Sequence, residues 1–253
     1  MLKKRIIPVQ LLVDQRLVKT VRFGAMRDVG DPVASSRVYS AQSADELCFL
    51  NIARDARSIA PLIAVLERVS AVCFMPLSLG GGIVCDEDAA NLIRLGADKV
   101  LINSALYRDV GIITRVGGVF GAQAVIAGID ARAEPDGGWS LWSDCGRVRQ
   151  DVSLSEHVRA CVAAGAGELL IQSIDRDGTM GGYDLALIQA VQTACPRPVI
   201  ALGGAGTYDH LLAAFQQTGV SALAMGSLFN FGDNNPLRAK AHLSNHGLRF
   251  KVI

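Results

Sequence analysis

Two carboxylates close apolar runs in the second half of the sequence. Asp130 ends the run in VIAGIDAR, and Asp177 lies in SIDRDGT, just after GELLIQSI. Apolar surroundings raise the pKa of a carboxyl group, which can then serve as a general acid or base. Asp130 is therefore the candidate catalytic group, and an ion pair or a loop cap is its structural alternative. For Asp177, chemistry and capping of the next helix are equally compatible with the sequence.

Glycine-rich turns occur at two matched places. GGG at 80–82 precedes Asn103-Ser104, and GGAG at 203–206 precedes Gly226-Ser227. Gly80 and Ser104 are 24 positions apart, as are Gly203 and Ser227. Glycine lets backbone N–H groups approach a ligand, and a following helix N-terminus favours an anion. The pattern predicts two phosphate sites that hold a ligand phosphorylated at both ends.

Four charged residues stand at the starts of apolar runs: Arg5, Glu46, Lys99 and Glu168. Side chains alternate along a strand, so each charge shares a face with the residues two and four positions on, most of which are apolar. If that face points inward, two positive and two negative charges meet at one end of the fold. We expect a closed ring, which either seals that end or acts as a polar gate for a small molecule.

Strand-like and helix-like segments alternate along the chain and would position these groups. Strands are predicted over 5–12, 45–52, 73–80, 98–104, 123–131, 167–174, 198–204 and 221–227, with helices such as SIAPLIAVLERV and EDAANLIRLGA between them. Such alternation implies parallel strands with right-handed crossovers. Eight units favour an α/β fold, a single (β/α)8 TIM barrel, over a doubly wound open sheet. Both glycine clusters would then lie at the carboxyl ends of strands, where such barrels bind substrate.

An internal repeat also favours the barrel. The matched glycine segments are preceded by LNIARDA (50–56) in one half and QSIDRDGT (172–179) in the other. We therefore expect one domain over 1–253, made of two duplicated half-barrels of about 1–120 and 121–253. The irregular stretch 134–151 should form a hairpin over the exit of the fifth strand.

Composition excludes several classes of protein. With 25 basic and 24 acidic residues, the chain shows no sign of a nucleic-acid or membrane-surface partner. The basic and then apolar N-terminus is interpreted as a first strand, and no apolar run has the length of a membrane span. Six cysteines without Cys-x-x-Cys spacing suggest free thiols in a reducing cytoplasm. His242 and His246 share a helical spacing, but we expect neither a metal nor a cofactor.

Several long motifs together resemble a known family. RIIP, RDVGDPV, GADKVLIN, FGAQAVIAGIDA, SIDRDGTMGGYD and GGAG are similar to HisF, the cyclase subunit of imidazole glycerol phosphate synthase, from residue 1 to about 235. The resemblance implies a barrel that receives ammonia from a HisH-type glutaminase docked at its floor. It also implies that a bis-phosphate substrate at the top is converted to imidazole glycerol phosphate and aminoimidazole carboxamide ribotide.

The same resemblance assigns expected roles to individual residues. It implies that the four-charge ring is an ammonia gate, that Asp98 contacts the glutaminase, and that Lys19 is a flexible-loop lysine covering the substrate. Asp130 resembles one of two catalytic acids. One phosphate site would comprise Gly82, Asn103 and Ser104, and the other Asp177, Gly178, Gly204, Gly226 and Ser227.

The top of the barrel departs from the family pattern. The position of the second catalytic aspartate is Leu11, an aspartate is replaced by Asn51, and the glycine after Lys19 is Thr20. Leucine cannot transfer a proton, and losing one acid–base group costs roughly 10²–10⁴-fold in rate. Asp14, an odd number of residues further on, should face away and is no substitute.

Three hypotheses follow, and the first is favoured. The chain resembles the WbuZ-type HisF-like paralogues, which would supply ammonia to a sugar-amidating enzyme of surface-polysaccharide synthesis. The second hypothesis is a working cyclase subunit of histidine biosynthesis, against which Leu11 counts. The third is a barrel that only binds a phosphorylated ligand or regulates a partner, against which the complete charged ring counts.

Overall fold

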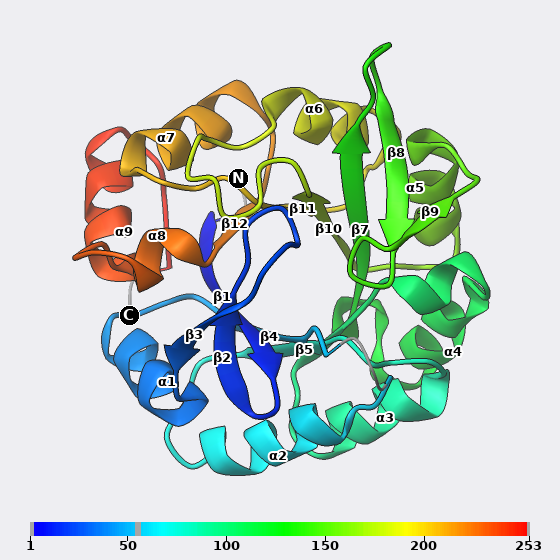
Figure 1. The fold of residues 1–253 in the computed structure, drawn as a ribbon, viewed down its shortest axis with the longest axis horizontal. Helices are drawn as coiled ribbons and strands as arrows, with labels where there is room; N and C mark the ends of the chain where they lie inside the picture. The colour runs from blue at the N-terminus through cyan, green and yellow to red at the C-terminus, as the bar shows by residue number, and fades with distance from the viewer. Residues whose placement is uncertain (1–2, 54–56, 252–253) are drawn as a thin grey trace.

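The computed structural model describes residues 3–53 and 57–251. Part of the LNIARDA segment, residues 54–56, therefore lies outside the described residues, as do the outermost residues of both termini. Eight parallel strands close into a barrel surrounded by helices (Figure 1). The closed (β/α)8 barrel is confirmed, and the open sheet is excluded because β1 pairs with both β12 and β4.

All eight predicted barrel strands are present, several of them shorter than predicted. They are β1 (Arg5–Val13), β4 (Leu47–Asn51), β5 (Leu77–Gly80), β6 (Lys99–Ile102), β7 (Val125–Ala133), β10 (Glu168–Ser173), β11 (Val199–Leu202) and β12 (Ala222–Met225). The third was predicted from residue 73, but β5 begins only after Pro76. Proline has no N–H to donate to a sheet, so the strand forms beyond it.

Helices between the strands cover the outside of the barrel. They are α1 (Pro32–Ala41), α2 (Ala60–Val69), α3 (Asp86–Arg94), α4 (Gly111–Phe120), α5 (Leu154–Ala163), α6 (Leu185–Ala194), α7 (Tyr208–Gln217), α8 (Ser227–Asn230) and α9 (Pro236–Asn245), with short 3₁₀ turns η1 (Ser104–Tyr107) and η2 (Ala122–Ala124). Several start at residues that favour a helix N-terminus. Asp31 caps α1 ahead of Pro32, and Ser153 forms a capping box with Glu156 on α5.

Two antiparallel additions extend over the mouth of the barrel, the end where the strands terminate. The predicted hairpin at 134–151 is confirmed: β8 (Trp139–Ser143) pairs with β7, and β9 (Val148–Gln150) pairs with β8. A second addition was not predicted. Strands β2 (Arg16–Lys19) and β3 (Arg27–Gly30) fold back on the end of β1.

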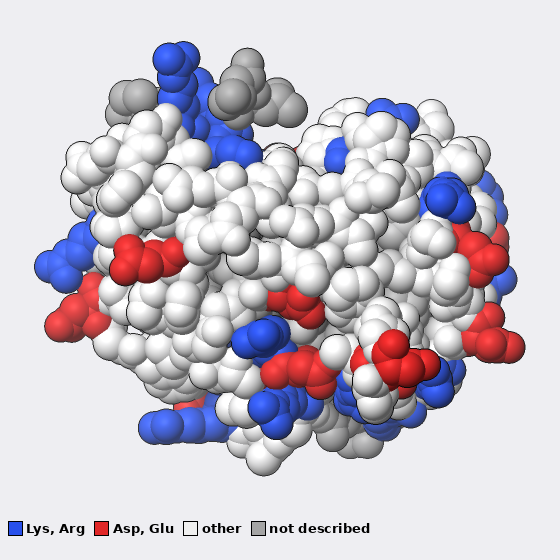
Figure 2. Space-filling model, turned by 90° about the horizontal axis from the view of Figure 1, so that it is seen from above, with Lys and Arg blue, Asp and Glu red and all other residues white. Residues whose placement is uncertain are grey.

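Apolar side chains fill the molecule in two layers. One lies between strands and helices, and the other fills the inside of the barrel, from Ile7 and Val9 to Leu101, Leu170 and Ile200. In Figure 2, which views the molecule from above, charged side chains gather at both sides and over the lower part of the face, and a broad uncharged area lies across its middle. Helix α6, at the top of Figure 1, carries no charged side chain. The described part of the chain has no helix long and apolar enough to cross a membrane.

Candidate functional site

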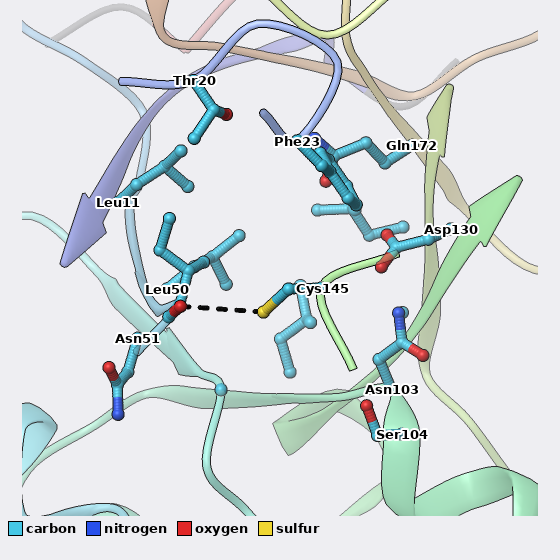
Figure 3. Close-up of a pocket in the computed structure, with 15 residues that line it drawn as sticks. Leu11, Thr20, Phe23, Leu50, Asn51, Asn103, Ser104, Asp130, Cys145 and Gln172 are labelled. Carbon is cyan, nitrogen blue, oxygen red and sulfur yellow. Dashed lines mark hydrogen bonds between the residues drawn. The ribbon is translucent and has the colours of Figure 1, made fainter. Parts of the chain in front are cut away.

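A cavity opens at the mouth of the barrel, between the two antiparallel additions (Figure 3). Its walls are largely apolar, with a few polar groups at their edges. Residues from six barrel strands or their exit loops line it, among them Leu11, Leu50, Asn51, Gly81, Leu101, Asn103, Asp130, Leu170 and Gln172. The predicted inward faces of the first, fourth, fifth and sixth barrel strands therefore converge on one site.

Asp130 is the central titratable group of this cavity. It lies on β7 beside Gln172 of β10. Burial and the nearby Asp177 carboxylate raise the pKa of Asp130 to about 7, and a hydrogen bond from Asn103 opposes the shift. A carboxyl group with a pKa near neutrality can both donate and accept a proton under physiological conditions. The geometry is thus suited to the acid–base role predicted for Asp130.

Leu11 lies across the cavity from Asp130 (Figure 3). It is buried and pairs with Val18 of β2 and Leu50 of β4, so this wall of the cavity is apolar. Asp14 is exposed in the turn after β1, with a positive φ of 48°. The carboxylate nearest to Leu11 in sequence therefore points away from the cavity, as its odd spacing predicted.

The first cradle, as we call the matched loops after β5 and β6, contains the predicted Gly82, Asn103 and Ser104. Gly82 has a φ of 79°, and a Cβ atom there would collide with the Ser58 carbonyl. Only glycine fits such a left-handed, crowded turn. The structure brings all three predicted residues of this site together around one cavity.

The second cradle lies after β11 and β12, and it contains Gly178, Gly204, Gly226 and Ser227 together with Asp177 and Lys19. Gly204 has a φ of 102°, and a Cβ atom there would collide with the Gly182 carbonyl. The turn therefore requires glycine, as in the first cradle. All residues predicted for this site line the same cavity.

Lys19 differs from the flexible-loop residue that the resemblance implied. It ends strand β2, is buried, and donates a hydrogen bond from Nζ to the Val9 carbonyl at 2.8 Å. A Cβ atom on Gly226 would collide with this ammonium, which places Lys19 inside the second cradle. Burial lowers the pKa of Lys19 to about 8, although Asp177 acts in the opposite direction.

Asp177 fastens the β2–β3 hairpin to the barrel. Its Oδ2 accepts hydrogen bonds from Thr20 Oγ1 at 2.8 Å and from the Phe23 backbone N–H at 3.2 Å. The next helix, α6, is capped by Asp184, so the predicted capping alternative for Asp177 is wrong. Thr20, one of the departures from the family pattern, thus has a structural partner of its own.

Asn51 also has a structural role. Its Nδ2 donates to the Ser58 carbonyl at 2.9 Å, and its Oδ1 accepts from the Ala53 N–H at 3.1 Å. An aspartate could not donate the first of these bonds. The amide therefore organises the loop after β4, at the border of the central cavity and the first cradle.

The four charges predicted at the strand starts form a closed ring at the barrel floor. Arg5 lies 3.1 Å from Glu46 and 2.7 Å from Glu168, and Lys99 lies 2.8 Å and 3.1 Å from the same two carboxylates. Ser78 adds a short hydrogen bond to Glu46. The ring is partly buried beneath the apolar inside of the barrel. Its members satisfy one another, which a buried charge requires.

Other predicted residues lie apart from the mouth. Asp98 is exposed at the floor, beside the ring member Lys99, and its carboxylate accepts a hydrogen bond from the Leu77 N–H at 2.8 Å. His242 and His246 lie on and after α9, and no cluster of potential metal ligands occurs among the described residues. All six cysteines are free thiols, four of them buried.

Sequence analysis missed several residues of the mouth. Phe23 and Cys145 line the central cavity, while Arg57, Arg108 and Arg147 line the first cradle. Each arginine lies in or near a loop that follows a predicted strand, so basic residues in these loops could have been proposed as part of the site. Which loops converge could not be judged without the barrel geometry.

Fold and site together define a (β/α)8 barrel with two glycine-built cradles that flank a largely buried carboxyl group. The family model for "Histidine biosynthesis protein" matches residues 5–235, and the chain belongs to this family. It is 42% identical over 253 residues, the whole of both chains, to the imidazole glycerol phosphate synthase subunit HisF of Hyphomonas neptunium. The predicted resemblance to HisF is confirmed, while the finer WbuZ-type resemblance remains a hypothesis.

Proposed function

We propose that this protein is the ammonia-using barrel of a synthase of the HisF type, in which Asp130 provides acid–base chemistry on a ligand held by two phosphate cradles. A single observation carries the proposal: one barrel combines the charged ring at its floor with two matched cradles on either side of Asp130. The 42% identity to a HisF subunit over the full length of both chains supports this cyclase function over the ammonia-relay hypothesis that the sequence favoured.

Ammonia would enter at the floor. The ring of Arg5, Glu46, Lys99 and Glu168 stands at the base of the barrel interior, which leads through apolar side chains to the mouth. In this proposal the ring is a gate whose ion pairs rearrange to admit a small neutral molecule.

A glutaminase of the HisH type is the proposed source of ammonia. The loops before β5 and β6 and the end of α4 expose Phe74, Leu95 and Val119, with Phe74 88% accessible. These elements precede neighbouring strands and border the floor beside Asp98. In this proposal these side chains belong to the face that contacts the glutaminase, because burying exposed apolar surface favours association. The subunit name of the Hyphomonas relative supports a partner as well.

Leu11 supports a second candidate function. An apolar wall opposite Asp130 leaves the cavity with one of the two carboxylates that the family's ring closure employs. As a relay, the barrel would pass ammonia from the glutaminase to a separate amidating enzyme, for example one acting on a surface-polysaccharide sugar. This role needs the ring and the floor but no cyclase chemistry.

Turnover of the purified protein tests the two candidates. The assay supplies ammonium salt and the bis-phosphate ribulosyl substrate and follows formation of imidazole glycerol phosphate. Sustained turnover that Asp130→Asn abolishes supports the cyclase. If substrate binds without product formation, while the barrel still stimulates its glutaminase, the cyclase proposal fails and the relay takes its place. Asp136→Asn, in an exposed turn, is the matched control.

A further inference from the structure

The central cavity between the two cradles has an apolar side and a polar side. Four leucines from four different strands supply most of the apolar side, and they are Leu11, Leu50, Leu101 and Leu170. The polar side consists of Asn103, Asp130 and Gln172, which lie on or just after the adjacent strands β6, β7 and β10. Figure 3 shows Leu11 and Leu50 on one side of the cavity and Asp130 and Gln172 on the other.

The four leucines present apolar surface to this cavity. They remain between 3% and 9% accessible, while the next residue along or before each of them on the outer face of its strand is at most 1% accessible: Leu12, Phe49, Ile102 and Leu169. The outer residues are covered completely by the helices, whereas the leucines are covered only in part. Contact with an apolar ligand would remove this remaining surface from water, which is favourable.

Glycines in the barrel strands hold two of these leucines in place. A Cβ atom on Gly80 would lie 2.9 Å from Leu50 Cδ2, and a Cβ atom on Gly128 would lie 2.8 Å from Leu101 Cδ2. Each leucine therefore packs directly against the backbone of a neighbouring strand, in space that a larger residue would fill. The apolar side is thus a fixed part of the barrel, and its shape does not depend on a mobile loop.

Phe23 adds an aromatic ring from the β2–β3 hairpin. It lines the same cavity, and its N–H donates to Asp177 at 3.2 Å. A Cβ atom on Gly146 would lie 2.9 Å from Phe23 Cδ2, so the β8–β9 turn packs against the ring. Aromatic rings prefer offset-stacked or edge-to-face contacts with one another. A ring held between the two antiparallel additions therefore favours an aromatic ligand over an aliphatic one.

Asp130 is the group that a ligand would meet on the polar side. Its carboxyl group points into the cavity (Figure 3), and Asn103 is hydrogen-bonded to it. A carboxyl oxygen can accept a hydrogen bond from a ligand O–H or N–H. A second polar group on the ligand would face the leucines, where it would lose its water and gain no partner. The cavity thus fits one hydrogen-bonding group on an otherwise apolar body.

We propose that the central cavity binds an uncharged aryl group with a single O–H or N–H donor, the ring lying against Leu11, Leu50 and Phe23 and the donor bonded to Asp130. This inference goes beyond the proposed function, because neither of its candidates assigns a hydrocarbon ring to the cavity. Leu11 and Leu50 determine specificity in this arrangement. They favour a hydrocarbon ring and disfavour a sugar or a strongly hydrated heterocycle at the same place.

Calorimetric titration of the intact protein with p-cresol tests the aryl site. We expect one saturable site and a negative heat-capacity change, which marks burial of apolar surface. Hydroquinone, in which a hydroxyl replaces the methyl group, should bind about ten-fold more weakly because that hydroxyl finds no partner. Toluene lacks the donor to Asp130 and should also bind about ten-fold more weakly. Leu11→Asn should weaken p-cresol binding about ten-fold, while the apolar and similarly sized Leu11→Met should retain it.

Leu237→Asn is the matched control. Leu237 lies on α9, is exposed and does not line the cavity, so the same substitution there should leave the affinity unchanged. Absence of a saturable p-cresol site, equal affinity for hydroquinone or toluene, or undiminished binding in Leu11→Asn would overturn the aryl site. Cyclase turnover is measured separately. Turnover without p-cresol binding would reject this inference alone, and p-cresol binding without turnover would reject the cyclase alone.

Discussion

The raised pKa of Asp130 makes the stability of the fold depend on pH, and the variant Asp130→Asn tests this dependence. The folded pKa of about 7 lies above the ordinary value of 3.8 for an aspartate, so the folded state holds the proton more tightly than the unfolded state. The contribution of Asp130 to folding is therefore most favourable below about pH 4. It is lost progressively as the pH rises through 7. Asparagine has nearly the same shape and no charge, so the variant should lose this pH dependence.

The size of the effect follows from the shift. About three pH units at about 1.36 kcal/mol each give an upper bound of about 4 kcal/mol. Because the Asp130 side chain retains some contact with solvent, we expect about 2–3 kcal/mol. At pH 8 the variant should be more stable than the natural protein by this amount, or about 5–10 °C in melting temperature, and at pH 4 the two should be alike.

Urea unfolding monitored by circular dichroism at pH 5, 6, 7 and 8 measures this difference. Asp136→Asn removes an exposed carboxylate and should shift stability equally at every pH. The reasoning would be refuted if Asp130→Asn changed stability by the same amount at pH 5 and pH 8, because burial would then not have perturbed the carboxyl group. Loss of turnover in the same variant tests its chemistry separately.

Three further predictions concern the cavity, the ring and the cradles. Leu11→Asp should raise cyclase turnover measurably, because it adds a second acid–base group. It should cost about 1–3 kcal/mol of stability, since a carboxylate enters an apolar wall. Unchanged turnover with substrate bound would show that more than this position has diverged. Lys99→Ala should cost about 2–3 kcal/mol of stability because it leaves a carboxylate of the ring unpaired. It should also lower the ratio of glutamine-dependent to ammonium-dependent product formation, and an unaltered ratio would reject the gate. Crystals grown with sulfate or phosphate should show an anion at Gly82 and at Gly204, and both loops empty would count against the cradles.

Local pattern made the barrel predictable. Each barrel strand is apolar and leads to a helix, either directly or after an antiparallel hairpin. These patterns are set by residues that are close together in sequence. The ring at the floor was predictable for the same reason, because Arg5, Lys99 and Glu168 begin strands whose inward parity can be counted. The β2–β3 hairpin was not, because its pairing depends on the end of β1 and on Asp177, which is 157 residues from Thr20 in sequence.

The sequence by itself determined the fold, the two glycine-built cradles and the absence of a carboxylate at position 11, since these depend on residue type, strand alternation and repeat spacing. Only the tertiary structure decided that Lys19 lies inside the second cradle and that three arginines surround the first. Contacts of this kind join loops that barrel closure brings together from distant parts of the chain. Side-chain electrostatics depend on such distances in space, which spacing along the sequence does not encode.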